Sequence, residues 1–250
     1  ADCPPFSVLL SLFFLLLHTT HHAPLRLPAL RLRAWVRASR PGRRCGRRSG
    51  LRQRLSGSPA LTQILTRLTA HLAAHPPVGS PDTSAVRAAV ALIHVPSPDA
   101  ILVIHRAIRA GDPWSGQMGL PGGHAEAEDR DLVATAIRET AEEVGIRLDR
   151  SDLVGPLDDV APKSVVPPPF LVRPFLFALA ARPRLRLSSE AVAAIWVEWS
   201  ALADPADRRE VTITIGDRPR SVPAFVIDGR VIWGMTERIL APLVRVTRDG

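Results

Sequence analysis

The residues of this sequence best suited to chemistry are three glutamates in one short segment, Glu139, Glu142 and Glu143. Their spacing of i, i+3 and i+4 places the three carboxylates on one face of a helix. Carboxylates stacked in this way repel one another, and a hard divalent cation, which prefers oxygen ligands, removes that repulsion. On these residues alone, a solvent-exposed acidic helix face remains an alternative to a metal site.

Arg138 and the pair Gly122-Gly123 strengthen the metal interpretation. A guanidinium holds a carboxylate through two parallel hydrogen bonds, so Arg138 is expected to orient Glu139 and to keep it ionised. Two adjacent glycines allow a tight backbone turn, and a metal ion or a phosphate can approach their amide and carbonyl groups closely. Together these features predict a site for a hard cation and for phosphate oxygens.

A helix over Asp131–Val144, ended by Gly145, is predicted to carry the glutamates. Its other faces hold the apolar residues that would pack on a sheet, Leu132, Val133, Ala136, Ile137, Ala141 and Val144. Two strands are predicted upstream, over Ala85–Val95 and Ala100–His105, and a loop rich in glycine and proline over 111–123 joins them to the helix.

Further elements are predicted on both sides of this core. A helix capped by Ser58-Pro59 and ended by Pro76-Pro77 has apolar positions at Leu61, Ile64, Leu65, Leu68 and Leu72. Five β-like segments follow the glutamate helix, over 153–160, 171–178, 194–199, 211–215 and 224–227, and a last helix is predicted over 235–244. This order predicts an α/β (α+β) fold with a mixed or largely antiparallel sheet.

The segment from Gly122 to Ile146, GGHAEAEDRDLVATAIRETAEEVGI, resembles the Nudix box G-x5-E-x7-R-E-U-x-E-E-x-G-U, in which U is aliphatic. The matching residues are Gly123, Arg138, Glu139, Glu142, Glu143, Gly145 and Ile146, with Thr140 at the first aliphatic position. The stretch between Gly123 and Arg138 is one residue longer than in the general pattern. Either Asp129 or Arg130 therefore stands at the first glutamate, and Asp129 is our choice.

The one-residue-longer box with an aspartate in place of the glutamate resembles the box of the coenzyme A diphosphatase branch of the Nudix family. That branch carries an upstream stretch L-L-T-x-R-S-x3-R-x3-G-x3-F-P-G-G, and this chain has LVIHRAIRAGDPWSGQMGLPGG from Leu102 to Gly123. The positions that fit are Arg106, Gly116, Pro121, Gly122 and Gly123. The chain departs at Ala107, at Leu120 and at Asp112, which stands where the second arginine is expected; Arg109 is a candidate substitute.

The resemblance implies a Nudix-type α/β/α sandwich over 58–250 that uses Mg²⁺ or Mn²⁺ to split a diphosphate by water attack on phosphorus. Metal ligands would be Glu139, Glu142, Glu143 and the backbone of Gly123, and Arg138, Glu142 and Glu143 would take part in catalysis. The general base would be a box glutamate or Glu190. Coenzyme A is the first candidate substrate; alternatives are ADP-ribose, other nucleoside diphosphate or triphosphate compounds, and a module that senses a nucleotide without cleaving it.

Five residues around the box are expected to border the substrate: Arg106, Trp114, Gln117, Gly122 and His124. Simpler interpretations compete for three candidates. Trp114 would only anchor its loop, His124 would only be a solvated loop histidine, and Glu190 would be an ordinary surface glutamate. A substrate-side turn at Pro167–Phe170 is left open.

The segment 1–57 has a different composition from the rest of the chain. Residues 1–60 contain eleven arginines and one acid, a balance of +10, so 61–250 carry −2 of the total of +8. We predict a disordered Arg-rich extension; a transit peptide or a nucleic-acid-binding tail is the alternative. The domain itself is expected to bind a small nucleotide and no nucleic acid or membrane, with a homodimer left open. Both cysteines, Cys3 and Cys45, lie in the extension, so the domain has no disulfide framework. This suits a reducing compartment, and we expect the cytoplasm.

Overall fold

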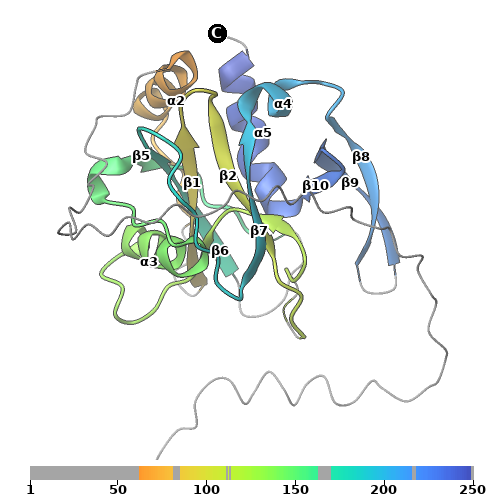
Figure 1. Cartoon of the computed structure of the whole chain (residues 1–250), viewed down its shortest axis with the longest axis horizontal. Coiled ribbons are helices and arrows are strands. Elements are labelled where there is room, and N and C mark those ends of the chain that lie inside the picture. Colours follow the sequence, from red (N-terminus) through yellow and green to blue (C-terminus); the bar gives the residue numbers. More distant parts are fainter. Residues whose placement is uncertain are drawn as a thin grey trace, which may run out of the picture. The chain divides into compact units, whose positions relative to one another are not determined.

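The computed structural model describes residues 62–80, 85–110, 112, 114–162, 170–215 and 218–248. The extension 1–57, the predicted cap Ser58-Pro59 and the segment 167–169 lie outside the described residues. The elements, shown in Figure 1, are α2 (Gln63–Ala74), β1 (Val86–Val95), β2 (Ala100–Arg106), β3 (Met118–Gly119), β4 (Gly122–His124), α3 (Leu132–Val144), η1 (Arg150–Asp152), β5 (Leu153–Pro156), β6 (Phe170–Ala178), β7 (Ala191–Glu198), α4 (Trp199–Ala203), β8 (Arg208–Ile215), β9 (Arg218–Ile227), β10 (Arg230–Trp233) and α5 (Gly234–Arg248).

Seven strands form the main sheet, in the order β3-β2-β1-β6-β5, with β4 paired to β1 and β7 paired to β2. β1 and β6 run parallel, from Val86 opposite Phe170 to His94 opposite Ala178. The other strand pairs of this sheet are antiparallel. The predicted mixed sheet is therefore confirmed, and the parallel pair at its centre brings β4 and β6 to opposite edges of β1.

Alternate residues of the central strand β1 pack on opposite faces of this sheet. Ala89, Ala91 and Ile93 belong to a cluster that includes Ala136 and Val144 of α3. Leu92 belongs to a second cluster with Leu68 of α2 and with apolar residues of α5. Since successive strand residues point to opposite faces, α3 covers one face and α2 with α5 cover the other, which is the expected α/β/α sandwich.

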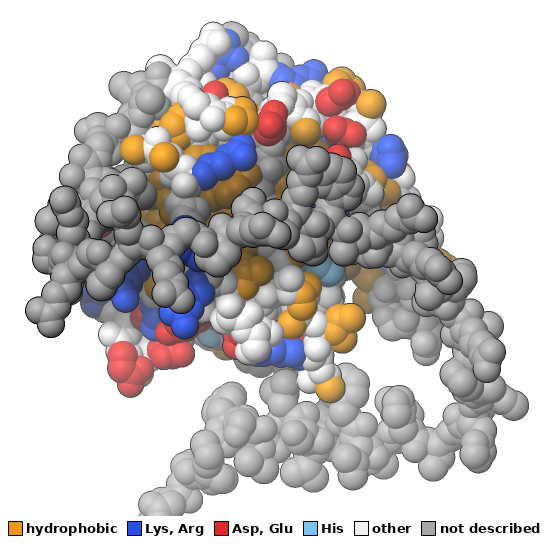
Figure 2. Space-filling model, viewed as in Figure 1, with side chains coloured by type: hydrophobic (Ala, Val, Ile, Leu, Met, Phe, Trp, Pro, Cys, Tyr) orange, Lys and Arg blue, Asp and Glu red, His pale blue; other side chains and the backbone are white. Residues whose placement is uncertain are grey.

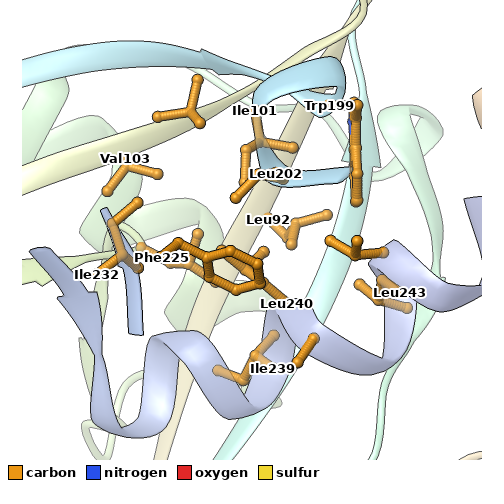
Figure 3. Close-up of a cluster of buried hydrophobic side chains, with 14 of the residues drawn as sticks. Leu92, Ile101, Val103, Trp199, Leu202, Phe225, Ile232, Ile239, Leu240 and Leu243 are labelled. Carbon is orange, nitrogen blue, oxygen red and sulfur yellow. The ribbon is translucent and has the colours of Figure 1, made fainter. Parts of the chain in front are cut away.

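The second cluster also fixes a small three-stranded sheet, β10-β9-β8, to the body of the domain. Phe225 of β9 and Ile232 of β10 are fully buried and lie against Leu240 and Ile239 of α5 (Figure 3). Most of β8 and the first half of β9 are exposed. Among the described helices, none is both long and apolar enough to cross a bilayer.

A buried histidine explains where the strand predicted over 194–199 ends. Trp199 donates its indole N–H to Nδ1 of His94 at 3.1 Å, so Nδ1 is unprotonated and the neutral ring carries its proton on Nε2, 3.1 Å from Asp99. Burial lowers the pKa of His94, although Asp99 opposes the shift. Asp99 also accepts a hydrogen bond from Thr62, the N-cap of α2. These contacts hold Trp199 as the first residue of α4, so its assignment to the strand was wrong.

Other boundaries of the predicted helices and strands differ from the structure where the local hydrophobic pattern is weak. The predicted loop 111–123 contains the short strand β3 and the first two residues of β4, and β10 was not predicted. α2 begins at Gln63, after the cap Thr62. β8 and β9 begin earlier than predicted because their exposed halves lack a hydrophobic face.

An ion cluster around Asp159 joins β1, β6 and the segment before β1. The carboxylate of Asp159 is 3% exposed and accepts hydrogen bonds from Nε of Arg173 at 2.5 Å, from Nη1 of Arg87 at 3.1 Å and from the N–H of Ser80 at 2.8 Å. Burial alone raises the pKa of Asp159, but the hydrogen bonds from Arg173 and Ser80 outweigh burial, and the pKa lies below its usual value.

The variant Asp159→Asn is expected to lower the free energy of unfolding by about 2 kcal/mol at pH 7, because Arg173 loses its charged partner. Since the folded-state pKa is lowered, this stabilisation is present above the unfolded-state pKa and is lost as pH falls through the folded-state pKa. The difference between wild type and variant should therefore shrink below about pH 4. Urea unfolding between pH 7 and pH 3 measures it, with the exposed Asp228→Asn as control; a constant difference contradicts the prediction.

Candidate active site

Helix α3 is fixed at both ends: Gly145 ends it as predicted, whereas Asp131, predicted as its first residue, is its N-cap. Asp131 caps its start by accepting a hydrogen bond from the N–H of Ala134 at 2.9 Å. Gly145 ends it with φ of 72°, a left-handed conformation that favours glycine. A side chain at Gly145 would also come within 2.8 Å of Cβ of Arg186, so the loop before β7 packs directly on the helix end. Thr140, at the first aliphatic position, is buried with its hydroxyl bonded to the carbonyl of Ala136 at 2.7 Å.

The three glutamates of α3 differ strongly in exposure. The side chains of Glu139 and Glu143 are 14% and 2% exposed, whereas that of Glu142 is 58% exposed. The helix is therefore rotated so that Glu139 and Glu143 face β4 and Glu142 faces solvent. In Figure 2, acidic and basic side chains lie side by side over the region where Figure 1 places α3.

Glu143 is held between the glycine strand and an arginine. Its Oε2 accepts the N–H of Gly122 at 2.9 Å, and its Oε1 lies 3.4 Å from Nη1 of Arg106. Burial raises the pKa of Glu143 to about 7, against the lowering effect of Gly122 and Arg106, while the charges of Glu139 and Glu190 add to the rise. Three acidic groups and one arginine thus interact at this end of β4.

Glu139 lies directly against the backbone of Gly123. A Cβ atom built on Gly123 would overlap the carboxylate of Glu139, so only glycine leaves room for it. Burial raises the pKa of Glu139, Arg138 opposes this shift, and the charges of Glu142 and Glu190 add to it. Close approach, rather than an unusual backbone conformation, is the reason for glycine at this position.

The variant Gly123→Ala is expected to lower kcat about 100-fold, because the new methyl group displaces the Glu139 carboxylate by roughly an ångström. The free energy of unfolding should change by less than about 1 kcal/mol, since the atoms displaced are the end of a flexible side chain. Steady-state kinetics and urea unfolding measure the two effects. Gly119→Ala is the matched control, because a Cβ there meets nothing closer than 3.9 Å. Equal kinetics in both variants would contradict the prediction.

Arg138 connects four oxygen-bearing partners around the start of α3. Its Nε and Nη2 bond the two oxygens of Asp129 at 3.1 and 2.9 Å, and its Nη1 reaches Glu139 at 2.9 Å and Glu142 at 3.1 Å. Nη2 also donates to the carbonyl of His124 at 2.9 Å. The hydrogen bonds from Arg138 lower the pKa of Asp129 to about 2. The structure thus places Asp129 against the box arginine, whereas the neighbouring Arg130 is 69% exposed.

The upstream arginines contact acids of the site. Nη2 of Arg106 lies 3.1 Å from Asp112, so one guanidinium spans Asp112 and Glu143. Arg109 pairs with Glu190 at 3.0 Å, but both side chains are 45% exposed, so this pair contributes little to stability. Glu190 is nevertheless close enough to raise the pKa values of Glu139 and Glu143.

Three rings meet beside β4. Trp114 stacks on Phe170 with centroids 5.2 Å apart, and the ring of His124 lies 5.0 Å from the same phenylalanine. Partial burial and the charge of Arg106 lower the pKa of His124. The contact agrees with the interpretation of Trp114 as a loop anchor. Gln117 is fixed through its backbone, which donates to the carbonyl of Trp114 and accepts from the N–H of Arg106.

The chemistry of the donors fits a hard cation, although the carboxylates do not converge. Glu139, Glu142 and Glu143 offer only oxygen, which Mg²⁺ and Mn²⁺ prefer. Within the described ranges, however, no group of three or more acidic, histidine or cysteine side chains has an arrangement that would hold a metal ion. The physical reason is that Arg138 draws Glu139 and Glu142 to one side, while Gly122 and Arg106 hold Glu143.

Comparison with known proteins agrees with this geometry. The model of the Nudix domain matches residues 85–214, a little over half of the chain. An uncharacterized protein of Schizosaccharomyces pombe is 39% identical over 45% of this chain and 35% of its own length. An uncharacterized Nudix hydrolase NudL of Photorhabdus laumondii is 26% identical over 63% of this chain and 83% of its own length. The mitochondrial coenzyme A diphosphatase of Mus musculus is 32% identical over 31% of this chain and 37% of its own length.

The chain thus spans only about a third of the length of the yeast and mouse relatives. The domain match nevertheless covers β1 to β8, including the glycine strand, Arg138 and the glutamates of α3. On this match, the chain belongs to the Nudix family.

Proposed function

We propose that this protein is a metal-dependent diphosphatase that splits the diphosphate linkage of a nucleotide-like small molecule, with coenzyme A or a derivative as its substrate. The observation that carries the proposal is the position of α3. It presses Glu139 against the backbone of Gly123 and directs Glu143 to the N–H of Gly122. The carboxylates of Glu139 and Glu143 then lie beside the glycine pair, where a diphosphate and its counter-ions would bind.

The residues that would hold Mg²⁺ or Mn²⁺ are Glu139, Glu142, Glu143 and the backbone of Gly123. When bound, the cation neutralises the diphosphate and stabilises the leaving oxygen. Burial of the carboxylates of Glu139 and Glu143 is costly without a cation. Burial raises the pKa of both groups, and the charges of neighbouring acids add to the rise in each case. This cost supports metal binding at the site.

Arg138 positions the ligands rather than the substrate. Its two parallel bonds to Asp129 fix the plane of the guanidinium, and its Nη1 is then directed at Glu139 and Glu142. Glu190 is the outside candidate for the base that activates water, because it lies near Glu139 and Glu143 and is 45% exposed. Arg109, its partner at 3.0 Å, would hold the Glu190 side chain in place.

Coenzyme A is supported by two observations. The longer box brings Asp129, and not a glutamate, to Arg138. One relative with local similarity, from Mus musculus, is named a coenzyme A diphosphatase. ADP-ribose and other nucleoside diphosphate or triphosphate compounds are the alternative substrates, since the carboxylates of α3 would serve all of them.

The test is turnover of a substrate panel by the full chain with Mg²⁺ or Mn²⁺. The panel contains coenzyme A, ADP-ribose, NADH, diadenosine polyphosphates and nucleoside triphosphates, and chromatography separates the products. We expect cleavage of coenzyme A to phosphopantetheine and 3′,5′-ADP, lost on chelation of the metal.

Cleavage of another panel member alone would keep the reaction and overturn the substrate. A folded protein that binds nucleotides and cleaves none would overturn the proposal in favour of a sensing module.

A further inference from the structure

A cavity of about 500 Å³ opens beside the exposed glutamate of the site. Its wall includes Glu142 and Gly145 from the end of α3, Arg147 after the helix, and Arg186 with Ser188 from the loop before β7. Since Glu142 belongs to both, the cavity adjoins the candidate active site. Nothing in the proposed cleavage step uses its two arginines.

The loop that carries Arg186 is fixed on the end of α3. The N–H of Arg186 donates to the carbonyl of Val144 at 2.8 Å, and the N–H of Ser188 donates to the carbonyl of Glu143 at 2.9 Å. These bonds satisfy carbonyl groups that a helix end leaves unpaired. The Cβ of Arg186 packs closely over Gly145, where no side chain would fit. The backbone position of Arg186 is therefore set independently of any ligand.

The cavity carries an unbalanced positive charge. Within the described residues, neither Arg147 nor Arg186 has a hydrogen-bond or ion-pair partner for its guanidinium. The single acid of the wall, Glu142, already bonds Arg138 at 3.1 Å. Two guanidiniums around a small cavity, with a serine hydroxyl beside them, form a recognition set for a dianionic phosphate group.

We infer that this cavity binds a phosphomonoester of the substrate that lies apart from the diphosphate being split. The inference rests on the proposed function, and it divides the candidate substrates by chemistry. Coenzyme A carries a 3′-phosphate on the ribose next to its diphosphate, whereas dephospho-coenzyme A and ADP-ribose carry no phosphate outside the diphosphate. The cavity thus favours nucleotides phosphorylated at a second position of the sugar.

The test compares coenzyme A with dephospho-coenzyme A, which differ only in the 3′-phosphate. For the full chain we expect kcat/KM at least ten-fold higher for coenzyme A, with the difference in KM and not in kcat. Arg147→Gln and Arg186→Gln should each reduce that preference several-fold and leave turnover of dephospho-coenzyme A unchanged. Because the arginines are exposed, the preference should also fall as salt rises.

A binding measurement keeps the inference testable whatever the turnover. Calorimetry with 3′,5′-ADP and with 5′-AMP should give about ten-fold tighter binding of 3′,5′-ADP, lost in Arg186→Gln. Arg184→Gln, an exposed arginine of the same loop that does not line the cavity, is the matched control. Equal kcat/KM for coenzyme A and dephospho-coenzyme A, together with equal affinity for 3′,5′-ADP and 5′-AMP, overturns the inference, even if diphosphates are cleaved. Failure to cleave any diphosphate overturns the proposed function alone, provided that 3′,5′-ADP still binds more tightly than 5′-AMP.

Discussion

The variant Glu143→Gln is expected to lower kcat for diphosphate cleavage by about 1,000-fold, the range found when a charged group of a metal or acid–base centre is neutralised. Glutamine keeps the shape of the side chain and an oxygen that can accept the N–H of Gly122, the bond that measures 2.9 Å in the wild type. What is lost is the negative charge that would bind the cation. The variant therefore separates the chemistry of this position from its packing.

Stability should change little in the same variant. The carboxylate of Glu143 is 2% exposed, and its pKa of about 7 reflects the cost of burying its charge. A neutral amide avoids that cost but leaves Arg106 without one of its two acidic partners. The two effects oppose each other, so the free energy of unfolding should stay within about 1 kcal/mol of the wild type.

Steady-state kinetics and urea unfolding of Glu143→Gln check both expectations. Glu128→Gln, an exposed acid within the same box, is the control and should keep wild-type kinetics. If Glu143→Gln retained kcat within ten-fold of wild type, the cleavage site would have to lie away from α3.

The positions of the glutamates on α3 could be predicted from the sequence, but their separate environments could not. The apolar stripe, the cap Asp131 and the stop at Gly145 specify the helix locally. The unequal exposure of Glu142 and Glu143 depends instead on β4, a strand of three residues without a hydrophobic pattern of its own. Its place is fixed by pairing with β1, which is distant in the sequence.

Long-range contacts also account for the partners that the sequence did not reveal. Asp112 was noted only as a departure from the expected arginine. In the structure it binds Nη2 of Arg106, while Glu143 binds Nη1 of the same guanidinium. Phe170 was considered only as the end of an open substrate-side turn; it begins β6, and it meets Trp114 and His124 because β1 and β6 pair in parallel. No local signal distinguishes such residues from ordinary loop or strand positions, since the sheet brings together segments far apart in the chain.

The second large effect is expected for Arg138→Lys, which keeps the charge and removes the planar fork. Lysine cannot bond both oxygens of Asp129 and also reach Glu139 and Glu142, as Arg138 does at 2.9 to 3.1 Å. We expect kcat to fall about 100-fold because Glu139 is no longer held in place. The free energy of unfolding should fall by about 2 kcal/mol, the cost of a partly buried acid that loses its partner.

The same measurement distinguishes positioning from a general charge effect. Arg130→Lys makes the identical substitution at an exposed residue nearby and should alter neither quantity. Asp129→Asn should reproduce the loss of stability, and the double variant Asp129→Asn with Arg138→Lys should lose much less than the sum of the two, because both single changes break one shared contact. Strict additivity would mean that Asp129 and Arg138 act independently, and the assignment of Asp129 as the first acid of the box would then fail.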